Sequence, residues 1–291
     1  NNPAIFTAYE PGSTFKSITM AAGLDMGKVK PETTYTDYGS IMIDGWPKPI
    51  KNSDFETFGG HGVTNMTQVL EASLNTGAIF VVQKVGADSF KDYVKNFGFG
   101  EKTGIELETE SEGNIISLTA KKVRPVEIAT ASFGQGITAT PLQMIASFAT
   151  IANGGVLMKP YIVGEIIKPN GIKEITQPKQ IRRVISERAS LLLTGMMVNV
   201  VENGHSKRAK VDGYYVAGKT GTAQVAEKSG YSEDRTIHTF IGFTPSDDPK
   251  FVMLVKLDAP KDAPFAESTS APLFGEIAEF ALNYYQVPKE R

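Results

Sequence analysis

The segment Tyr9-Glu10-Pro11-Gly12-Ser13-Thr14-Phe15-Lys16 decides how the chain folds around it. Proline fixes φ and glycine frees it, so Pro11 and Gly12 end whatever structure precedes them. Apolar or small residues then recur at helical spacing, which predicts a helix with one buried face that ends at Gly27. The residues of that face are Phe15, Ile18, Thr19 and Ala22. Ser13 is therefore predicted at the N-terminus of a helix.

Ser13 and Lys16 stand three residues apart, a spacing that places two side chains on the same face of a helix. A serine hydroxyl is a poor nucleophile until a base takes its proton. The Lys16 amine can act as that base, and the positive end of the helix favours the alkoxide. We therefore predict Ser13 as a nucleophile and Lys16 as its base.

The composition is that of an ordinary globular protein. The 291 residues are 41% apolar and 21% charged, and 30 basic against 32 acidic residues leave a net charge of −2. This balance indicates neither a nucleic-acid partner nor an anionic membrane surface. The absence of cysteine excludes disulfides, thiolate metal sites and a cysteine nucleophile. The three histidines have no metal-ligand spacing, so we predict no metal and no other cofactor.

Periodicity and turn residues predict a single α+β domain over residues 1–291. Short polar loops join the last three strands, which favours an antiparallel sheet packed between helices. Helices are expected at about 65–72, 75–86, 88–97, 141–152, 187–203 and 270–285. Strands are expected at about 214–225, 238–243 and 251–257, with a hairpin from 161–167 and 172–176. Residues 28–64 are rich in turn-forming residues and predict irregular loops with short strands.

Two further patterns carry polar groups that suit acyl transfer. Ser73-Leu74-Asn75 falls at a predicted helix break, and Lys219-Thr220-Gly221-Thr222 falls inside a predicted strand. Glycine weakens a strand interior unless a ligand or another backbone must come close. An edge strand with a lysine and hydroxyls can pair with an extended peptide and hold its carboxylate. A second Lys-Thr-Gly, Lys102-Thr103-Gly104, lies in a predicted loop and is assigned no role. Each pattern alone also fits a plain structural role, such as a helix cap or a solvated lysine.

The three patterns together match the S-x-x-K, S-x-N and K-T-G set of penicillin-binding proteins and class A β-lactamases. Their order and spacing agree with that set. The similarity extends from Tyr9 to Pro245, in the stretches YEPGSTFK, EASLNTGAIFVVQKVG, FGFGEKTGIEL, SFGQGITATPLQMIASFATIANGG, VAGKTGTAQ and HTFIGFTP. The chain resembles the transpeptidase domain of a class B penicillin-binding protein, nearest the septal, cell-division branch.

This resemblance implies a serine acyl-transfer site. Ser13 would attack the carbonyl of the penultimate D-alanine of a peptidoglycan stem peptide, and Lys16 would take its proton. Ser73 would relay that proton to the leaving amine, with Lys219 close enough to tune both groups. The Asn75 amide would orient Lys16 and the substrate backbone. An amine from a neighbouring stem would then attack the acyl-enzyme, and β-lactams would trap the serine.

The resemblance also implies the binding surfaces around the serine. Thr220, Gly221 and Thr222 would bind substrate, with the two threonine hydroxyls on its terminal carboxylate. The backbone N–H groups of Ser13 and Thr222 would form the oxyanion hole. The implied partners are the stem-peptide donor and the acceptor amine, β-lactam antibiotics, and divisome or glycan-polymerase partners that act through the parent protein.

The chain opens on Asn1 and holds no apolar run of the ~18 residues that would span a membrane. The family carries further transpeptidase-domain residues before the active serine, a pedestal region and an N-terminal membrane anchor. We therefore expect a truncated piece of a longer protein, with a sheet that is short of strands. The parent would act at the extracytoplasmic face of the bacterial cytoplasmic membrane.

Other functions remain open. The segment from Gly213 to Thr220 satisfies the P-loop pattern of nucleotide hydrolases, although strand-forming residues lie between its glycines and no helix start follows the lysine. A β-lactamase would use the same three patterns but needs a glutamate that activates water, and none is convincing between Ser73 and Lys219. A non-catalytic β-lactam sensor would be acylated once and would not turn over.

Overall fold

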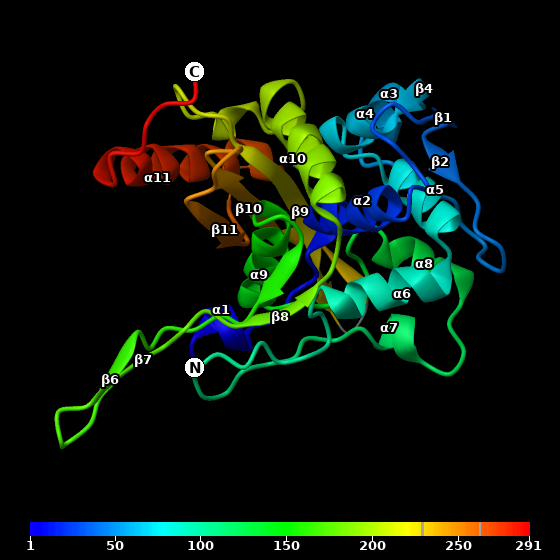
Figure 1. Cartoon of the computed structure of the whole chain (residues 1–291). Helices are drawn as coiled ribbons and strands as arrows, with labels where there is room; N and C mark the ends of the chain where they lie inside the picture. The colour runs from blue at the N-terminus through cyan, green and yellow to red at the C-terminus, as the bar shows by residue number, and fades with distance from the viewer. Residues whose placement is uncertain (228–229, 262) are drawn as a thin grey trace.

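Helices surround an antiparallel sheet in the computed structural model, which describes residues 1–227, 230–261 and 263–291 (Figure 1). The predicted α+β class is confirmed. The α-helices are α1 (Pro3–Phe6), α2 (Lys16–Asp25), α3 (Phe55–Phe58), α4 (Met66–Glu71), α5 (Asn75–Val85), α6 (Ala87–Asn96), α7 (Ile116–Thr119), α8 (Pro125–Ala131), α9 (Pro141–Ala152), α10 (Glu187–Glu202) and α11 (Ser270–Tyr284). Short 3-10 helices cover η1 (Gly12–Phe15), η2 (Lys207–Ala209) and η3 (Ala266–Ser268).

The central sheet comes from the last three strands, in the order β11-β10-β9, with antiparallel neighbours as predicted. The strands are β1 (Thr34–Asp37), β2 (Ser40–Ile41), β3 (Ile50–Lys51), β4 (Gly62–Asn65), β5 (Val156–Met158), β6 (Glu165–Ile167), β7 (Lys173–Ile175), β8 (Gln180–Arg183), β9 (Ala217–Glu227), β10 (Gly230–Thr244) and β11 (Phe251–Asp258). Within the described residues β9 is therefore an edge strand.

β10 is longer than its sequence pattern predicts. The apolar run of residues 238–243 marks only the part that is buried between helices. Before this run the strand continues as a two-stranded ribbon, in which Tyr231 pairs with Ala226 and the register shifts between Tyr231 and Thr236. None of the ribbon side chains whose burial the structure describes is buried, and accordingly the sequence shows no apolar alternation from which a strand could be predicted.

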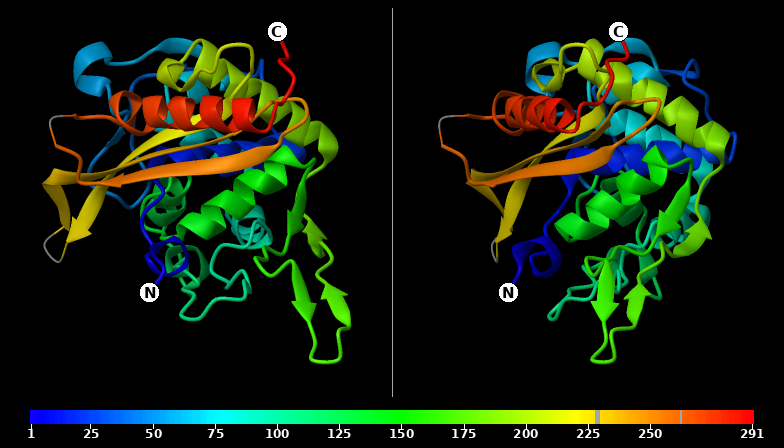
Figure 2. Two further views of the ribbon diagram at one scale, coloured as in Figure 1. Left: turned by 90° about the vertical axis from the view of Figure 1, so that its left-hand side faces the viewer. Right: turned by 60° about the vertical axis from the view of Figure 1, so that its left-hand side comes forward.

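The two faces of the central sheet pack against different helices. On one face Phe240 of β10 contacts Phe274 of α11, with ring centroids 4.5 Å apart. On the other face Ile241 and Phe243 join the larger core that α2, α9 and α10 share. Successive side chains of a strand point to opposite faces, which explains this division. Figure 2 shows α11 along one face of the sheet and α9 on the other.

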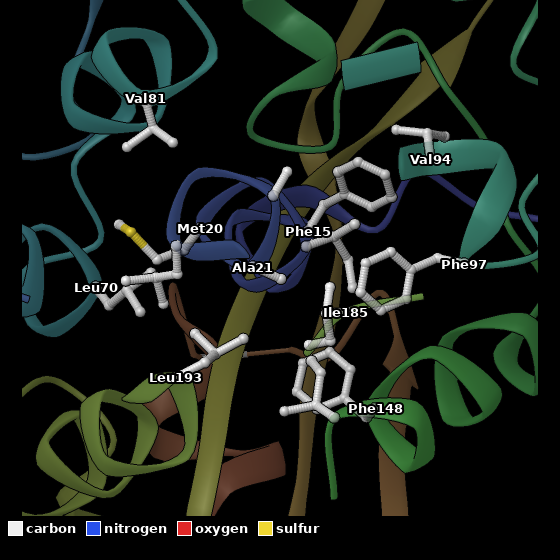
Figure 3. Packing of buried hydrophobic residues seen from close by; sticks show 14 of the residues in the cluster. Phe15, Met20, Ala21, Leu70, Val81, Val94, Phe97, Phe148, Ile185 and Leu193 are labelled. Atoms are coloured by element: carbon white, nitrogen blue, oxygen red, sulfur yellow. The ribbon is translucent and has the colours of Figure 1, made fainter. Parts of the chain in front are cut away.

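Helix α2 runs through the larger core, and the predicted single apolar face is too narrow. Every residue from Lys16 to Leu24 is buried. Figure 3 shows Met20 and Ala21 of this helix among side chains from other elements, which include Leu70, Val81, Phe148 and Leu193. The helix ends where predicted, because Gly27 adopts a φ of +63° and its N–H donates to the Leu24 carbonyl. Ser13 lies in η1, the turn before α2, and not in α2 itself.

Side-chain caps begin three of the helices that the sequence predicts. Asn65 accepts a hydrogen bond from Gln68 N at 2.9 Å at the start of α4. Thr140 accepts from Gln143 N before α9, and Ser186 accepts from Ala189 N before α10. Each cap satisfies a backbone N–H that the first turn of a helix leaves without a partner.

Short elements lie outside the two packed layers. Strands β1 to β4 form two small sheets, as the turn-rich residues 28–64 predict. The predicted hairpin is present as β6 and β7, which extend away from the body of the molecule (Figure 1). Among the described residues, no helix has the length and apolar character needed to cross a membrane.

Candidate active site

Ser13 lies in the tight turn that leads into α2. Gly12 has a φ of +56°, which favours glycine, and its N–H donates to the Gly134 carbonyl at 3.1 Å. The Thr14 hydroxyl donates to the Pro11 carbonyl at 2.7 Å and closes the turn. Lys16 opens α2 on the same side, and its Nζ lies 3.0 Å from Ser13 Oγ. The predicted pairing of these two groups is therefore present in the structure.

Ser73 lies at the break between α4 and α5, directly beside Lys16. Its φ is +56°, in the left-handed region that side chains other than glycine seldom adopt. Lys16 Nζ donates to the Ser73 carbonyl and lies 3.2 Å from Ser73 Oγ. Strained backbone of this kind persists only where the surroundings hold it, and it is common at functional sites. The backbone conformation at this break places the carbonyl oxygen and the hydroxyl oxygen of Ser73 next to the same amine, that of Lys16.

Lys219 approaches Ser73 from the central sheet. Its Nζ lies 2.9 Å from Ser73 Oγ and also donates to the Thr220 carbonyl at 3.2 Å. Strand β9 reaches this position because Gly221 has no side chain. A Cβ there would lie 2.9 Å from Thr14 Cγ2 and 3.0 Å from the Pro11 carbonyl oxygen. The close backbone approach predicted at this glycine is thus made to the turn that holds Ser13.

Burial and mutual repulsion change the protonation of the two lysines. The pKa of Lys16 lies well below its usual value because the side chain is buried and because the charge of Lys219 is close. Burial also lowers the pKa of Lys219, to about 8. Two buried cations near one another disfavour the state in which both are charged. Lys16 is therefore the lysine that more readily gives up its proton.

Asn75 does not make the predicted contact with Lys16. Its Nδ2 donates to the Lys51 carbonyl at 2.8 Å, and no hydrogen bond joins it to Lys16 in the described part of the chain. The Lys16 amine donates hydrogen bonds to Ser13 and Ser73 instead. The position of Asn75 is set by β3, an element whose proximity the sequence pattern does not indicate. Its Oδ1 has no partner among the described residues.

A buried carboxylate that the sequence analysis missed supports the segment around Asn75. Asp37 accepts hydrogen bonds from the Thr76 hydroxyl at 2.6 Å and from Asn52 Nδ2 at 3.0 Å. It also accepts from the backbone N–H of His61 at 3.0 Å. Buried charge is retained in proteins when it is hydrogen-bonded in this way. No motif marks Asp37, because its partners come from segments that only the tertiary structure brings together.

The threonines of the Lys-Thr-Gly-Thr segment lie on the other face of β9. Thr220 is buried and accepts a hydrogen bond from the Ser206 hydroxyl at 3.3 Å. Thr222 accepts from the Ala266 N–H at 3.1 Å. Lys219 and Gly221 alternate with them and face Ser73 and the Ser13 turn. The carboxylate contacts predicted for the two threonines stay a prediction.

The P-loop alternative is wrong. Lys219 lies within an extended strand, Ala217–Glu227, whereas phosphate binding requires that a helix begin at the lysine. Its amine is directed at Ser73. The second Lys-Thr-Gly lies in a loop, as predicted, where Thr103 donates through its backbone and hydroxyl to Glu110.

Glu10 is a further residue of the site that the sequence analysis did not single out. Its Oε1 accepts hydrogen bonds from Gly136 N at 2.9 Å and from the Tyr231 hydroxyl at 3.1 Å. Burial raises the pKa of this carboxyl. The contact with Tyr231 connects Glu10, the residue before Pro11, to the two-stranded ribbon of β9 and β10. Its place next to Pro11 in the sequence is the only signal that could have indicated it.

Nearly the whole chain matches one protein family. The penicillin binding protein transpeptidase domain matches residues 1–279. The chain belongs to this family. Stage V sporulation protein D of Bacillus subtilis is 39% identical over 290 residues, which cover 97% of this chain and 43% of that protein. The penicillin-binding protein PbpB of Mycolicibacterium smegmatis is 34% identical over 99% of this chain and 45% of its own length. The chain thus spans about half the length of the curated relatives that it matches.

Solved penicillin-binding proteins share the fold. Penicillin binding protein 3 of Mycobacterium tuberculosis, in complex with aztreonam, has a TM-score of 0.90 and 31% identity, over 100% of this chain and 66% of its own. The transpeptidase domain of penicillin-binding protein 3 of Burkholderia pseudomallei has a TM-score of 0.88 and 27% identity, over 100% of this chain and 84% of its own. The family predicted from the three motifs is confirmed.

Proposed function

We propose that this chain is a peptidoglycan D,D-transpeptidase domain that cross-links stem peptides through a Ser13 acyl-enzyme. The observation that carries the proposal is the convergence of two lysines on two serines, in a member of the penicillin-binding transpeptidase family. The peptidoglycan D,D-transpeptidase FtsI homolog of Mesostigma viride, 28% identical over 99% of this chain, supports it. Complexes of a similar protein with aztreonam and with ampicillin support covalent inhibition by β-lactams.

Acylation begins when Lys16 takes the proton of Ser13. The lowered pKa of the amine favours its neutral form, which can accept this proton. Ser13 Oγ then attacks the carbonyl carbon of the penultimate D-alanine, and the backbone N–H groups of Ser13 and Thr222 hold the oxyanion. When the C–N bond breaks, the proton passes through the Ser73 hydroxyl to the nitrogen of the leaving D-alanine. Lys219 keeps that hydroxyl oriented.

The acyl-enzyme is then resolved by an amine. The acceptor nitrogen attacks the ester carbon and gives a proton to the neutral Lys16 amine, the bond from this carbon to Ser13 Oγ breaks, and Lys16 passes that proton on to Oγ. Thr220 and Thr222 bind the terminal carboxylate of the donor before acylation, and the extended substrate lies along the edge of β9 at Gly221, whose lack of a side chain keeps this strand close to the Ser13 turn. The free Oδ1 of Asn75 accepts an N–H of the substrate backbone.

The proposal extends to the setting of the domain. Residues 1–291 form one transpeptidase domain of a longer protein, which an N-terminal helix holds at the outer face of the bacterial cytoplasmic membrane. The parent works with divisome or glycan-polymerase partners. Relatives named for sporulation and for FtsI support a role in septal or division-related wall synthesis. No cofactor is required, since the base and the nucleophile both come from the protein.

Labelling with a fluorescent penicillin tests the proposal. We expect a stable covalent label on the wild-type chain and no label on Ser13→Ala, with circular dichroism showing that both are folded. Rapid loss of the label with release of hydrolysed penicillin would instead mean a β-lactamase. A stable label without transfer from a D-alanyl thioester donor to an added amine would mean a sensor. Absence of any label would overturn the assignment.

A further inference from the structure

A surface cavity of about 280 Å³ adjoins the catalytic group. Ala72, the residue before Ser73, lines it, and so does Glu71. The opposite wall comes from the loop after α10, where the His205 N–H donates to the Glu71 carbonyl at 3.2 Å. The charge of Lys219 acts on the His205 ring. The cavity therefore lies beside the segment that carries Ser73.

The lining of this cavity suits a cation. It contains no lysine or arginine, and its one carboxylate, that of Glu71, has no hydrogen-bond or ion-pair partner in the described part of the chain. Burial raises the pKa of this carboxyl. The Thr64 hydroxyl donates to the Gly62 carbonyl, so its lone pairs stay free. The Asn203 amide donates through Nδ2, so its oxygen stays free as well. The lining thus offers one carboxylate without a partner and two oxygens whose lone pairs are free.

A second cavity of about 280 Å³ on the other side of His205 has the opposite character. Lys207 and Arg208 line it, together with one acid, Glu267. It adjoins the threonines of β9, because Ser206 contacts Thr220 and precedes Lys207 in the chain. The cavity that suits a carboxylate, lined by Lys207 and Arg208, is thus separate from the cavity that suits an ammonium, lined by Glu71.

We propose that the cavity lined by Glu71, Thr64 and Asn203 is the subsite that receives the primary ammonium group of the acceptor. This inference rests on the proposed transpeptidase function and adds the place from which the second substrate attacks. An ammonium has three donors and one positive charge, which match the unpaired carboxylate and the free oxygens of the lining. Because the donor stem peptide lies along β9 in the proposed function, this cavity stays open for the acceptor.

The bound ammonium must lose a proton before its nitrogen can attack. The His205 imidazole lines both cavities, and burial lowers its pKa although the carboxylate of Glu267 lies 3.4 Å from Nδ1. The neutral ring takes one proton from the ammonium. The nitrogen lone pair then forms the C–N bond with the acyl carbon, and the electron pair of the broken ester bond goes to Ser13 Oγ. The second proton of the amine passes to that oxygen through Lys16.

The test compares a cationic and a neutral nucleophile. A D-alanyl thioester acylates the chain, and the acyl-enzyme is resolved by n-butylamine, a cation at neutral pH, or by hydroxylamine, which is uncharged there. For Glu71→Gln we expect the half-saturating concentration of n-butylamine to rise about tenfold or more, since one charge-assisted contact is lost. The values for hydroxylamine and for hydrolysis should stay unchanged. Glu279→Gln, on an exposed turn of α11, is the matched control.

A second variant separates binding from proton transfer. His205→Asn should lower the rate at saturating n-butylamine without a comparable change in the half-saturating concentration. Equal shifts for both nucleophiles in Glu71→Gln, or no shift for n-butylamine, would overturn the subsite. Penicillin labelling and thioester hydrolysis report on acylation alone. If the wild type shows neither of these, the proposed function itself fails. If both persist without the amine effect, only this inference fails.

Discussion

Lys219 Nζ lies 2.9 Å from Ser73 Oγ, although 146 residues separate the two along the chain. The same hydroxyl lies 3.2 Å from Lys16 Nζ, so one serine connects an amine of the core helix with an amine of the sheet edge. Because both lysines are buried, the charge of Lys219 lowers the proton affinity of Lys16 more strongly than it would in water. The site works as a coupled group, and its parts can be tested separately.

Replacement of Lys16 tests its role as the base. We expect Lys16→Ala to lower the second-order rate of labelling by a fluorescent penicillin by about 10²- to 10⁴-fold, since this is the range that general-base catalysis supplies. Lys28→Ala, at an exposed position just after α2, should label at the wild-type rate. Circular dichroism checks that both variants are folded. Unchanged labelling of folded Lys16→Ala would remove Lys16 as the base.

The pH dependence of acylation should report the repulsion between the lysines. The rate rises with pH as Lys16 loses its proton, and the charge of Lys219 helps to hold the pKa of Lys16 low. In Lys219→Met this charge is gone, so the pKa of Lys16 should rise and the acid limb of the pH–rate profile should move to higher pH. The profile is measured with the same fluorescent penicillin, and Lys28→Met is the control. If the acid limb of the Lys219→Met profile lay at the same pH as that of the wild type, the charge of Lys219 would not act on the pKa of Lys16.

Stability should also depend on pH through Lys219. Its pKa is about 8 in the folded chain against an ordinary value of 10.5, so between these values the unfolded chain binds more protons than the folded one. Stability contributed by this group therefore rises from pH 8 to pH 10.5 and is lost as the pH falls back through 8. Lys219→Met should remove a rise of about 3 kcal/mol. Urea unfolding at several pH values measures it, and parallel curves for the two proteins would count against the burial effect.

Two glycine substitutions test the close approach of β9 to the Ser13 turn. In Gly221→Ala the new Cβ would lie 2.7 Å from Thr239 Oγ1 and 3.0 Å from the Pro11 carbonyl oxygen. We expect a loss of about 1–3 kcal/mol of stability and slower penicillin labelling, because the strand must move away from Ser13. Gly195→Ala, in α10 with open space at its Cβ, should instead stabilise the chain by about 0.5–1 kcal/mol. Thermal unfolding and labelling rates check both, and equal effects would refute the steric argument.

Local sequence signals were sufficient wherever the structure depends on neighbours along the chain. Asn65, Thr140 and Ser186 begin helices because each reaches a backbone N–H three residues ahead. The pairing of Ser13 with Lys16 is local for the same reason, since one turn brings the two side chains together. The spacing of the motifs was also sufficient to identify the family. The reason is that the three motifs supply side chains to a single site, so that their joint occurrence is specific.

Tertiary structure decided everything that depends on contacts between distant segments. The sequence predicted a contact of Asn75 with Lys16, but the carbonyl of Lys51 holds the Asn75 amide. The periodicity of the sequence does not predict that α2 is buried on every side, nor that Asp37 supports the helix break. A hydrophobic pattern indicates the apolar face of one element but not which other elements pack against it.

By itself the sequence determined the family and the pairing of Ser13 with Lys16, because those depend on short spacings and fixed chemistry. The lowered proton affinities of Lys16 and Lys219, the position of the threonines and the two cavities beside His205 were decided only by the folded chain. The physical reason is that burial and the distance between charges set these properties, and both arise only when helix, break and sheet edge pack together.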